Sequence, residues 1–567
     1  MAFDGIVTKA IASELQNLSG ARIDKIFEPN KNTIILGFYL DGKNYALNIC
    51  IDSQNCRLNL TTHTKPNPQV APNFCMLLRK HLIGLRIKNF ITRDLERVVI
   101  IEFEGLDEID NIINKKLVVE LMGKHSNIIL LDDSNIIIDS LRHTSSDLDC
   151  YRNIIPHVKY VFPTTEKYNF LDINDYNEFY SKLDNNDIDA MPKLISSKFN
   201  GICKSFIEAT INKNNNISTE ELFNYINKII SNIEKNKLNF EYYKNDYFLT
   251  SSETETSEFS LNFFIDDFYY NKETLEQFKS YRDSVLKMIL GKLKKYTTRL
   301  SNIDKKLAEC DNMDKYKLYG ELITANLYKI PTYNLESIEL ENYYDNNNLI
   351  TIPLDKKYNP SVNAKRFFKK YNKLKNTLVI VTEQKKETEN ELNYIESIVY
   401  ELQNAVTIDD VLEIYDEISE NVIFKDTKQQ SKKSYKLKKS KLTKNKTVSF
   451  NPIKYKIDNY ILLIGRNNVE NDYLTLKYAK KTDLWFHTKD IHGSHGILRL
   501  ENLQKPDYDL LIKCAEIVAY HSKARTSSNV PVDFCEVKYV KKPNGSKPGM
   551  VIYTNNETLN VNPKIPY

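Results

Sequence analysis

The chain has 567 residues, with 79 lysines and arginines against 75 aspartates and glutamates, a net charge of +4. This length is too great for one hydrophobic core and predicts about three or four domains. The start lacks the basic and apolar blocks of a secretory signal, and no apolar run approaches the roughly 20 residues of a membrane span. The eight cysteines are scattered, which argues against a disulfide framework or zinc ribbon and predicts reduced thiols in a cytoplasmic protein.

Residues 1–175 are predicted to form an α+β domain. A helical spacing of apolar residues at positions 6–15 follows Asp4, which is a suitable N-cap. Short β-rich runs come next, separated by turn signals such as Asp41-Gly42. This order of elements indicates a sheet with one or two helices packed on it.

Residues 176–270 are polar, rich in asparagine and predicted to be helical. Two short helical halves surround Gly201 within residues 194–209, a pattern that resembles a helix-hairpin-helix segment. A helical linker broken by glycine explains the same pattern equally well. Both interpretations predict one helix on each side of Gly201.

Residues 271–420 contain two heptad seams, in which apolar side chains recur at alternating steps of three and four residues. The first seam comprises Leu286, Ile289, Leu293, Tyr296, Leu300, Ile303, Leu307 and Cys310, and the second comprises Phe367, Tyr371, Leu374, Leu378, Val381, Lys385, Thr388, Leu392, Ile395, Val399 and Leu402. Two seams separated by a folded insert predict a long antiparallel coiled-coil hairpin that spans a distance between binding partners. The alternative is that a seam pairs with a second copy of the chain.

Residues 421–446 are predicted to be a basic linker. Ten lysines and a single acidic residue, Asp426, lie within residues 425–446. Such a run repels itself and cannot bury a core, so it predicts a flexible segment. Its lysines can also neutralise phosphates, which favours a nucleic-acid partner over a linker that is merely soluble.

Residues 447–567 are predicted to form a compact α+β domain. Its segment 483–498, "DLWFHTKDIHGSHGIL", holds three of the nine histidines and the only tryptophan. A zinc site is disfavoured because no cysteine lies nearby and strand residues alternate between faces. A nucleophilic catalytic site is disfavoured because the segment has no nucleophile with an orienting acid. We favour a binding surface in which Trp485, Phe486 and the histidines stack on bases, although at least one of these two aromatic rings is expected to fill the core.

Several segments resemble one known family. Residues 460–499, "YILLIGRNNVENDYLTLKYAKKTDLWFHTKDIHGSHGILR", are similar to the NFACT-R RNA-binding domain, and "MAFDG" and "ELMGKHSNIILLD" are similar to the NFACT-N domain. The segments "YKLYGELITANL" and "NPSVNAKRFFKKYNKLK" resemble those that flank the family's coiled-coil arms. The chain is therefore identified as a member of the RqcH and NEMF family of NFACT proteins, formerly named the fibronectin-binding protein A family. The resemblance implies an NFACT-N domain, a helix-hairpin-helix segment, an antiparallel coiled-coil hairpin and an NFACT-R domain.

The resemblance also implies a function in ribosome-associated quality control. Proteins of this family bind large ribosomal subunits that retain a peptidyl-tRNA after a stall, through ribosomal RNA and proteins of the stalk base. They recruit a tRNA, chiefly tRNA-Ala in bacteria, and direct template-free alanine tailing of the nascent chain, which marks it for degradation. The ribosome forms the peptide bond, so the resemblance implies a cytoplasmic scaffold without enzymatic activity, cofactor, metal or membrane partner.

The site residues implied by the resemblance fall in three segments. An Asp-Arg pair of the family matches Glu96-Arg97, with glutamate in place of aspartate, and Arg93-Asp94 is a second alignment for this pair. The expected tRNA-binding loop contributes Gly123, Lys124, His125, Ser126 and Asn127, and the expected RNA-binding residues of the C-terminal domain are Arg466, Asn467, Trp485, His487, Gly493, Ser494 and His495.

Two other functions remain as alternatives. The former family name suggests a surface adhesin that binds fibronectin, which the lack of a recognisable signal or repeat disfavours. The NFACT-N domain also resembles the N-terminal fold of formamidopyrimidine DNA glycosylases. Those enzymes use an N-terminal proline as nucleophile, whereas residue 2 here is Ala2, so glycosylase chemistry is unsupported.

Overall fold

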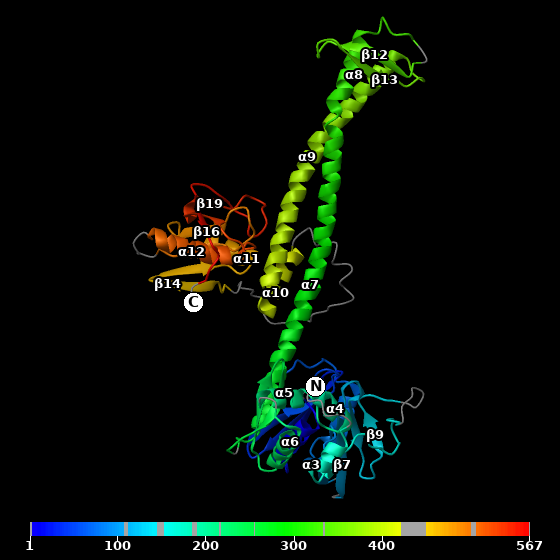
Figure 1. Cartoon of the computed structure of the whole chain (residues 1–567), viewed down its shortest axis with the longest axis vertical. Helices are drawn as coiled ribbons and strands as arrows, with labels where there is room; N and C mark the ends of the chain where they lie inside the picture. The colour runs from blue at the N-terminus through cyan, green and yellow to red at the C-terminus, as the bar shows by residue number, and fades with distance from the viewer. Residues whose placement is uncertain are drawn as a thin grey trace. The chain divides into compact units, whose positions relative to one another are not determined.

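A computed structural model of the chain describes residues 3–106, 111–144, 152–183, 190–214, 217–254, 256–332, 335–420, 450–500 and 506–565 (Figure 1). The chain forms two compact units, Met1–Leu275 and Glu276–Tyr567. The predicted domains 1–175 and 176–270 both fall within the first unit. The predicted basic linker, residues 421–446, lies outside the described residues.

The first unit is built on an antiparallel sheet of nine strands in the order β4-β3-β2-β1-β5-β6-β7-β8-β9. The strands are β1 (Arg22–Asn30), β2 (Thr33–Leu40), β3 (Lys43–Cys50), β4 (Arg57–Leu60), β5 (Arg86–Thr92), β6 (Val98–Leu106), β7 (Ile112–Glu120), β8 (Asn127–Leu131) and β9 (Ile137–Ser140). The predicted Asp41-Gly42 turn joins β2 to β3, and both residues have the positive φ angles, 48° and 79°, that a tight hairpin turn requires.

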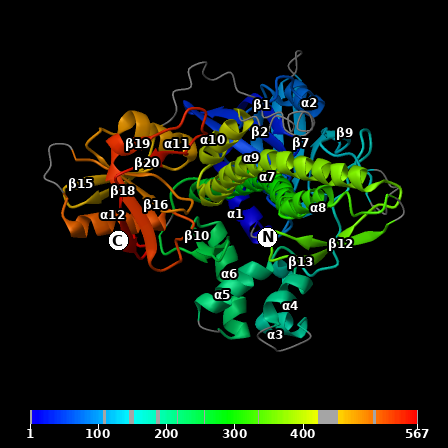
Figure 2. The same ribbon diagram turned by 90° about the horizontal axis from the view of Figure 1, so that it is seen from above.

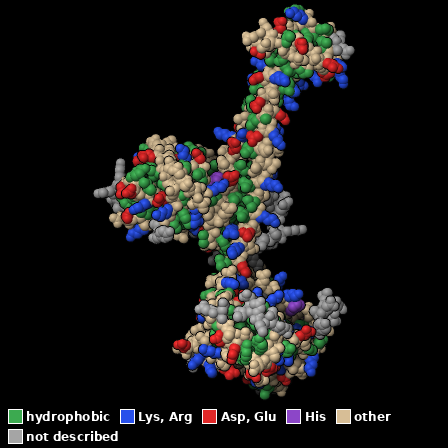
Figure 3. All heavy atoms as spheres, in the orientation of Figure 1, with side chains coloured by type: hydrophobic (Ala, Val, Ile, Leu, Met, Phe, Trp, Pro, Cys, Tyr) green, Lys and Arg blue, Asp and Glu red, His purple; other side chains and the backbone are tan. Residues whose placement is uncertain are grey.

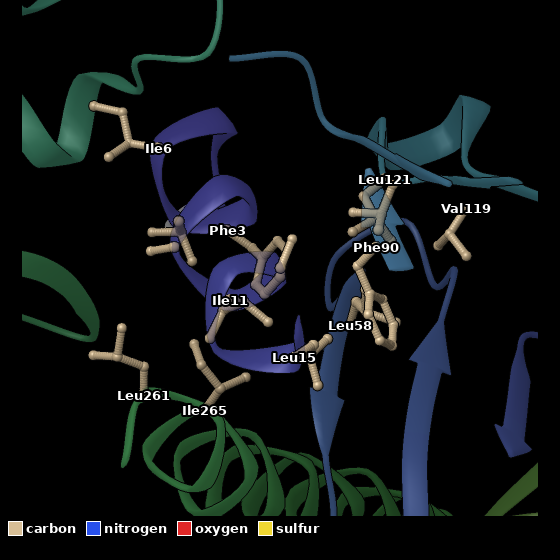
Figure 4. Close-up of a cluster of buried hydrophobic side chains, with 14 of the residues drawn as sticks. Phe3, Ile6, Ile11, Leu15, Leu58, Phe90, Val119, Leu121, Leu261 and Ile265 are labelled. Atoms are coloured by element: carbon tan, nitrogen blue, oxygen red, sulfur yellow. The ribbon is translucent and has the colours of Figure 1, made fainter. Parts of the chain in front are cut away.

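Helix α1 (Gly5–Leu15) packs on this sheet. Asp4 is its N-cap, as predicted, and accepts a hydrogen bond from the Val7 backbone N–H at 3.0 Å. The apolar face of the helix lies in the main core together with side chains of the sheet and of the first turns of α7 (Figure 4). Each fully buried large side chain in such a core contributes about 1.5–3 kcal/mol to folding.

Further helices and a small hairpin complete the first unit. They are α2 (Asn73–Leu82), α3 (Tyr176–Ser181), α4 (Met191–Lys198), α5 (Lys204–Lys213), α6 (Thr219–Ile233), β10 (Leu238–Tyr243) and β11 (Asp246–Ser251). Helices α4 and α5 flank Gly201, so the two helices predicted around this glycine are present. A function of this segment as a helix-hairpin-helix stays a prediction. The expectation that residues 176–270 are helical throughout is wrong at β10 and β11, which pair as a hairpin.

In the second unit, which includes α7 from Glu276 onward, two long helices pack side by side (Figure 1). They are α7 (Ser260–Cys310) and α9 (Pro360–Asn404), with α8 (Met313–Ala325), β12 (Ser337–Asn342) and β13 (Asn348–Pro353) between them and α10 (Ile408–Glu420) after them. Their contacts run in opposite directions, because Asp304 pairs with Lys385 at 2.9 Å whereas Cys310 Sγ lies 3.7 Å from the Leu374 carbonyl oxygen. The knobs-into-holes packing of a coiled coil stays a prediction. Basic and acidic side chains are interspersed along these helices in Figure 3.

The C-terminal domain, residues 450–565, has a six-stranded antiparallel sheet in the order β14-β15-β17-β16-β18-β21. The strands are β14 (Ile453–Ile457), β15 (Tyr460–Ile464), β16 (Leu484–Thr488), β17 (Gly496–Leu498), β18 (Val530–Glu536) and β21 (Glu557–Val561). Helix α12 (Tyr508–Tyr520) covers one face (Figure 2). The other face is covered by α11 (Asn468–Tyr473), the π-helix η6 (Leu474–Tyr478) and the hairpin of β19 (Val540–Lys541) and β20 (Ile552–Tyr553).

Among the helices that the structure describes, none has the length and apolar character needed to cross a membrane.

Candidate nucleic-acid interface

The Glu96-Arg97 pair and the loop 120–127 lie side by side in the first unit. Strands β6 and β7 pair so that Val98 faces Glu120, which places the turn before β6 beside the loop after β7. The Leu121 backbone N–H donates to the Arg97 carbonyl at 2.8 Å. The sheet therefore joins two segments that the resemblance assigned separately to tRNA binding.

The two alignments of the family's acid-arginine pair differ in their surroundings. Glu96 and Arg97 are half-buried, whereas Arg93 and Asp94 are exposed. Burial raises the pKa of Glu96, which the positive charge of Arg93 partly offsets. Burial and the positive charge of Arg97 both lower the pKa of Lys167, so a second cationic side chain stands close to Arg97.

Two glycines pack closely against the turn that carries Glu96 and hold it in place. The Gly5 backbone N–H donates to the Gly201 carbonyl at 2.8 Å. A Cβ atom on either glycine would overlap the carbonyl oxygen of Leu95, the residue before Glu96. The Asp4 carboxylate joins the same contact, because one oxygen accepts from α1 and the other accepts from the Cys203 N–H at 3.0 Å. The starts of α1 and α5 therefore hold this turn in place.

The loop 120–127 presents two cationic or polar side chains and buries two others. Lys124 and His125 are exposed, and Gly123 has a φ of +63°, which favours glycine. Ser126 and Asn127 are buried, at 1% and 2% exposure. The expectation that the Ser126 and Asn127 side chains contact tRNA directly does not fit this burial. Both side chains instead pack inside the protein beneath the loop.

Two arginines that the sequence did not single out support this loop. The Arg142 guanidinium donates to the carbonyl of Ser126 at 3.2 Å and to Asn32 Oδ1 at 2.9 Å. Arg152 binds the buried Glu120 carboxylate at the end of β7. Neither arginine belongs to a recognisable motif, so only the folded structure reveals these contacts.

In the C-terminal domain, Trp485 and Phe486 lie on opposite faces of β16 and neither is exposed. Trp485 belongs to the core under η6 and β19, and Phe486 belongs to the core under α12. Each therefore fills one of two separate cores, and the expectation that Trp485 stacks on RNA bases is wrong because its ring has no accessible face.

The histidines pack as aromatic rings around Trp485. His487 stacks on the Trp485 ring at 5.7 Å between centroids, and His495 meets it edge-on at 5.4 Å. Burial lowers the pKa of His487 to about 4 and that of His495 to about 3, so both imidazoles are neutral. Among the described residues, no group of three or more metal-binding side chains is placed to hold an ion.

The Gly493-Ser494 turn contacts the segment that follows α12. The Ser494 N–H donates to the His521 carbonyl at 3.0 Å, and the Lys523 N–H donates to the His492 carbonyl at 2.8 Å. A Cβ on Gly493 would lie 2.9 Å from Ser522 Cβ, which explains the glycine. The turn therefore brings the exposed Lys523 beside His492, and the Ser494 N–H is not open to a phosphate.

Arg466 and Asn467 join the C-terminal domain to α10. Arg466 forms ion pairs with Asp410 at 2.6 Å and with Glu470 at 3.1 Å. Asn467 caps α11 and also donates to Glu413 at 2.9 Å. These contacts place both side chains between two protein surfaces in the second unit.

Comparison with known proteins gives whole-length matches. The model of the NFACT N-terminal and middle domains matches residues 4–436, and the model of the NFACT protein RNA binding domain matches residues 446–555. The Rqc2 homolog RqcH of Bacillus subtilis is 32% identical over 99% of this chain and 98% of its own length. The corresponding protein of Streptococcus suis is 33% identical with the same coverage.

Solved structures match each half of the chain. The C-terminal part of the fibronectin/fibrinogen-binding protein from Streptococcus suis is 31% identical, covering 51% of this chain and 96% of that structure, with a TM-score of 0.38. The N-terminal part of the same protein is 28% identical, covering 48% of this chain and 100% of that structure, with a TM-score of 0.40. The two family models and the whole-length relatives show that this chain belongs to the NFACT family of Rqc2 and RqcH homologues.

Proposed function

We propose that the chain is a cytoplasmic ribosome-associated quality control factor, as the family membership supports. It binds stalled large ribosomal subunits that carry a peptidyl-tRNA, recruits a tRNA, expected to be tRNA-Ala, and directs template-free alanine tailing of the nascent chain. The ribosome forms the peptide bonds. The chain acts as a scaffold that selects and positions tRNA.

The observation that carries this proposal is the placement of the Glu96-Arg97 turn beside the exposed Lys124 and His125. A guanidinium can form two parallel hydrogen bonds with a phosphate or with a guanine edge, and a neighbouring carboxylate sets its orientation. Lys124 and His125 add donors on the same edge of the sheet. Together these side chains offer a compact cationic surface for one segment of tRNA.

The second unit provides a long helical arm and a second surface for RNA contact. Helix α9 has 45 residues, which corresponds to about 65 Å of helix. An arm of this length can contact the stalk base at one end and carry the C-terminal domain at the other. In that domain we assign RNA contact to the turn 492–494 with the adjoining Lys523, while the buried Trp485 and His495 support it and the half-buried His487 stacks on Trp485.

Sequencing of bound RNA tests the proposal. Full-length chain recovered from cells should carry ribosomal RNA of the large subunit and one enriched tRNA, whose identity names the added amino acid. The Glu96→Ala, Arg97→Ala double variant should retain the ribosomal RNA, lose most of the tRNA and abolish tailing. Arg22→Gln removes an exposed arginine of the same sheet and should change neither RNA. Recovery of neither RNA with the unmodified chain would rule the proposal out.

A further inference from the structure

The π-helix η6 of the C-terminal domain follows α11 directly and presents a row of exposed side chains. A π-helical turn is rare in proteins and is often found at a functional site. The Ala479 N–H donates to the Leu474 carbonyl at 2.9 Å, which closes the turn. Leu474 is buried in the core that contains Trp485. The exposed residues of the same turn are Leu476, Lys477 and Tyr478.

The Tyr478 ring is the centre of an aromatic cluster. The Phe450 ring lies 4.7 Å from it between centroids, and the Arg499 guanidinium lies over it at 4.9 Å. Phe450 also contacts the Tyr473 ring at 4.9 Å, so three aromatic rings adjoin one another. Tyr478 is still 40% exposed beside these neighbours. Part of the cluster is therefore open to a flat partner that stacks on aromatic rings.

The buried Asp483 holds the loop that follows η6. One of its carboxylate oxygens accepts from the Lys480 N–H at 2.9 Å, and the other accepts from the Leu500 N–H at 3.0 Å. Asp483 also pairs with Arg499 at 3.1 Å, and Arg499 is the side chain that lies over Tyr478. One carboxylate therefore positions both the arginine and the loop.

Exposed lysines adjoin this cluster on η6, on the loop after it and on the neighbouring short helix η7 (Val537–Tyr539). The Lys538 N–H of η7 donates to the Lys481 carbonyl of the loop at 3.2 Å, so the two segments lie side by side. The Lys538 ammonium pairs with Glu536 at 2.6 Å. The four exposed lysines are Lys477, Lys480, Lys481 and Lys538. With Arg499 they outnumber the Glu536 and Asp483 carboxylates, which gives this group of side chains a net positive charge that attracts phosphates.

The core around Trp485 supports η6 from inside. His495 Nδ1 lies 2.8 Å from Thr475 Oγ1, and Thr475 of η6 is buried, at 1% exposure. Leu474, the residue before it, packs in the same core as Trp485. The tryptophan and this histidine therefore help to set the position of the turn that exposes Tyr478.

We propose that the η6 surface, formed by Phe450, Tyr478 and these four lysines, binds unpaired RNA. A base stacks on the aromatic cluster, and the flanking phosphates meet the lysines. Stacking on an aromatic ring tolerates any base but requires a base whose face is free. In duplex RNA the bases stack on one another, so a surface for duplex alone gains nothing from an exposed ring. That this RNA belongs to the ribosomal subunit or to a tRNA rests on the proposed function.

Fluorescence anisotropy of short labelled oligouridylate with the full-length chain tests the η6 surface. Tyr478→Leu should weaken binding about tenfold, the loss expected when one base loses its stacking partner. Tyr478→Phe keeps the ring and should bind as the unmodified chain does. Neither variant should change the affinity for duplex RNA. Lys477→Gln and Lys481→Gln should each lower the slope of log affinity against log salt concentration by about 0.7.

Matched controls remove the same chemical groups on α12, which covers the other face of the sheet. Tyr508→Leu removes a tyrosine with 65% exposure, and Lys513→Gln removes a lysine with 54% side-chain exposure. Both should leave oligouridylate binding and its salt slope unchanged. Photocrosslinking of thiouridine-labelled RNA locates the contact directly and should mark residues 473–481. Equal losses in the η6 and control variants, or crosslinks confined to other segments, would overturn the proposal.

A protein is the other kind of partner that an aromatic and cationic surface can bind. In that case Tyr478→Leu would leave oligouridylate binding unchanged and reduce co-sedimentation with large ribosomal subunits, which would overturn the assignment to RNA. Failure of the ribosomal proposal is read separately, from the RNA recovered from cells, because the oligouridylate measurement requires no ribosome.

Discussion

Arg152 binds both carboxylate oxygens of Glu120 with one guanidinium group, at 2.9 and 2.8 Å. Glu120 has none of its surface exposed, and the Tyr160 hydroxyl donates to it at 2.7 Å. The pair lies at the end of β7, directly before the loop that presents Lys124 and His125. A buried carboxylate with compensated charge holds this strand end in a single geometry.

Arg152→Met should lower the free energy of unfolding by about 3 kcal/mol, because it leaves the buried Glu120 carboxylate without its counter-charge. Arg22→Met breaks the exposed pair with Asp24 and should cost less than about 1 kcal/mol. Urea denaturation of both variants measures the difference. Equal losses would contradict the assignment of Glu120 and Arg152 as a structural pair.

Gly201→Ala should weaken tRNA binding far more than it weakens binding to the large subunit. The new Cβ overlaps the Leu95 carbonyl and must displace the turn that carries Glu96. Gly20→Ala is the matched control, because Gly20 has a φ of +85° but no atom within 4 Å of a new Cβ. It should cost only the backbone strain, about 1 kcal/mol of stability, and leave tRNA binding intact. Filter binding of labelled tRNA to both variants distinguishes displacement from strain.

Local sequence signals predicted the helices, strands and turns of this chain better than the contacts between them. The Asp4 cap and the Asp41-Gly42 turn are set by neighbouring residues, and both are present. The β10–β11 hairpin was missed because its turn, Lys244-Asn245, lacks the usual glycine, although Lys244 adopts a φ of +55°.

The burial of Trp485 and Phe486 could not be decided from alternation alone. A strand with one covered face would expose one of the two rings. Here α12 covers one face and η6 with β19 covers the other, so both rings are buried. The same limit applies to Glu96 and Lys124, whose proximity depends on the pairing of β6 with β7 rather than on any spacing within the sequence.

A pair of buried acids should make the second unit less stable at higher pH. Burial raises the pKa of Glu417 to about 7 from 4.5, and Glu401 beside it is raised as well. A carboxyl whose folded pKa lies above its unfolded value contributes stability that is full below pH 4.5 and is lost as the pH rises through 7. The Tyr394 hydroxyl donates to Glu417 at 2.7 Å, so a glutamine there keeps an acceptor.

Thermal unfolding of the chain and of Glu417→Gln across this pH range measures the effect. The variant should match the unmodified chain near about pH 5 and exceed it by up to about 3 kcal/mol near about pH 8. Burial lowers the pKa of His487 and of His521 to about 4, which reduces stability as the pH falls below 6.5 in both proteins alike. The difference between the two proteins therefore reports on Glu417 together with its effect on Glu401, and a constant difference across the range would contradict the raised pKa of Glu417.

Arg466 distinguishes a docking role from an RNA contact. Its guanidinium pairs with Asp410 and Glu413 of α10 and with Glu470, so three carboxylates already compensate its charge. An arginine bound to phosphate contributes about one unit to the slope of log affinity against log salt concentration, whereas one that joins two protein surfaces contributes none. We expect Arg466→Gln to leave the salt slope of RNA binding unchanged.

A double-mutant cycle measures how strongly Arg466 and Asp410 are coupled in the folded protein. Arg466→Gln, Asp410→Asn and the double variant should give a coupling energy of about 1–3 kcal/mol in the unfolding of the second unit, because each side chain is largely removed from water. Lys523→Gln, beside the turn 492–494, is the contrasting variant and should lower the salt slope by about one without changing stability. If Arg466→Gln instead lowered the salt slope and the coupling energy were near zero, Arg466 would be a residue that contacts RNA. The Arg466–Asp410 pair would then be an exchangeable contact that RNA displaces.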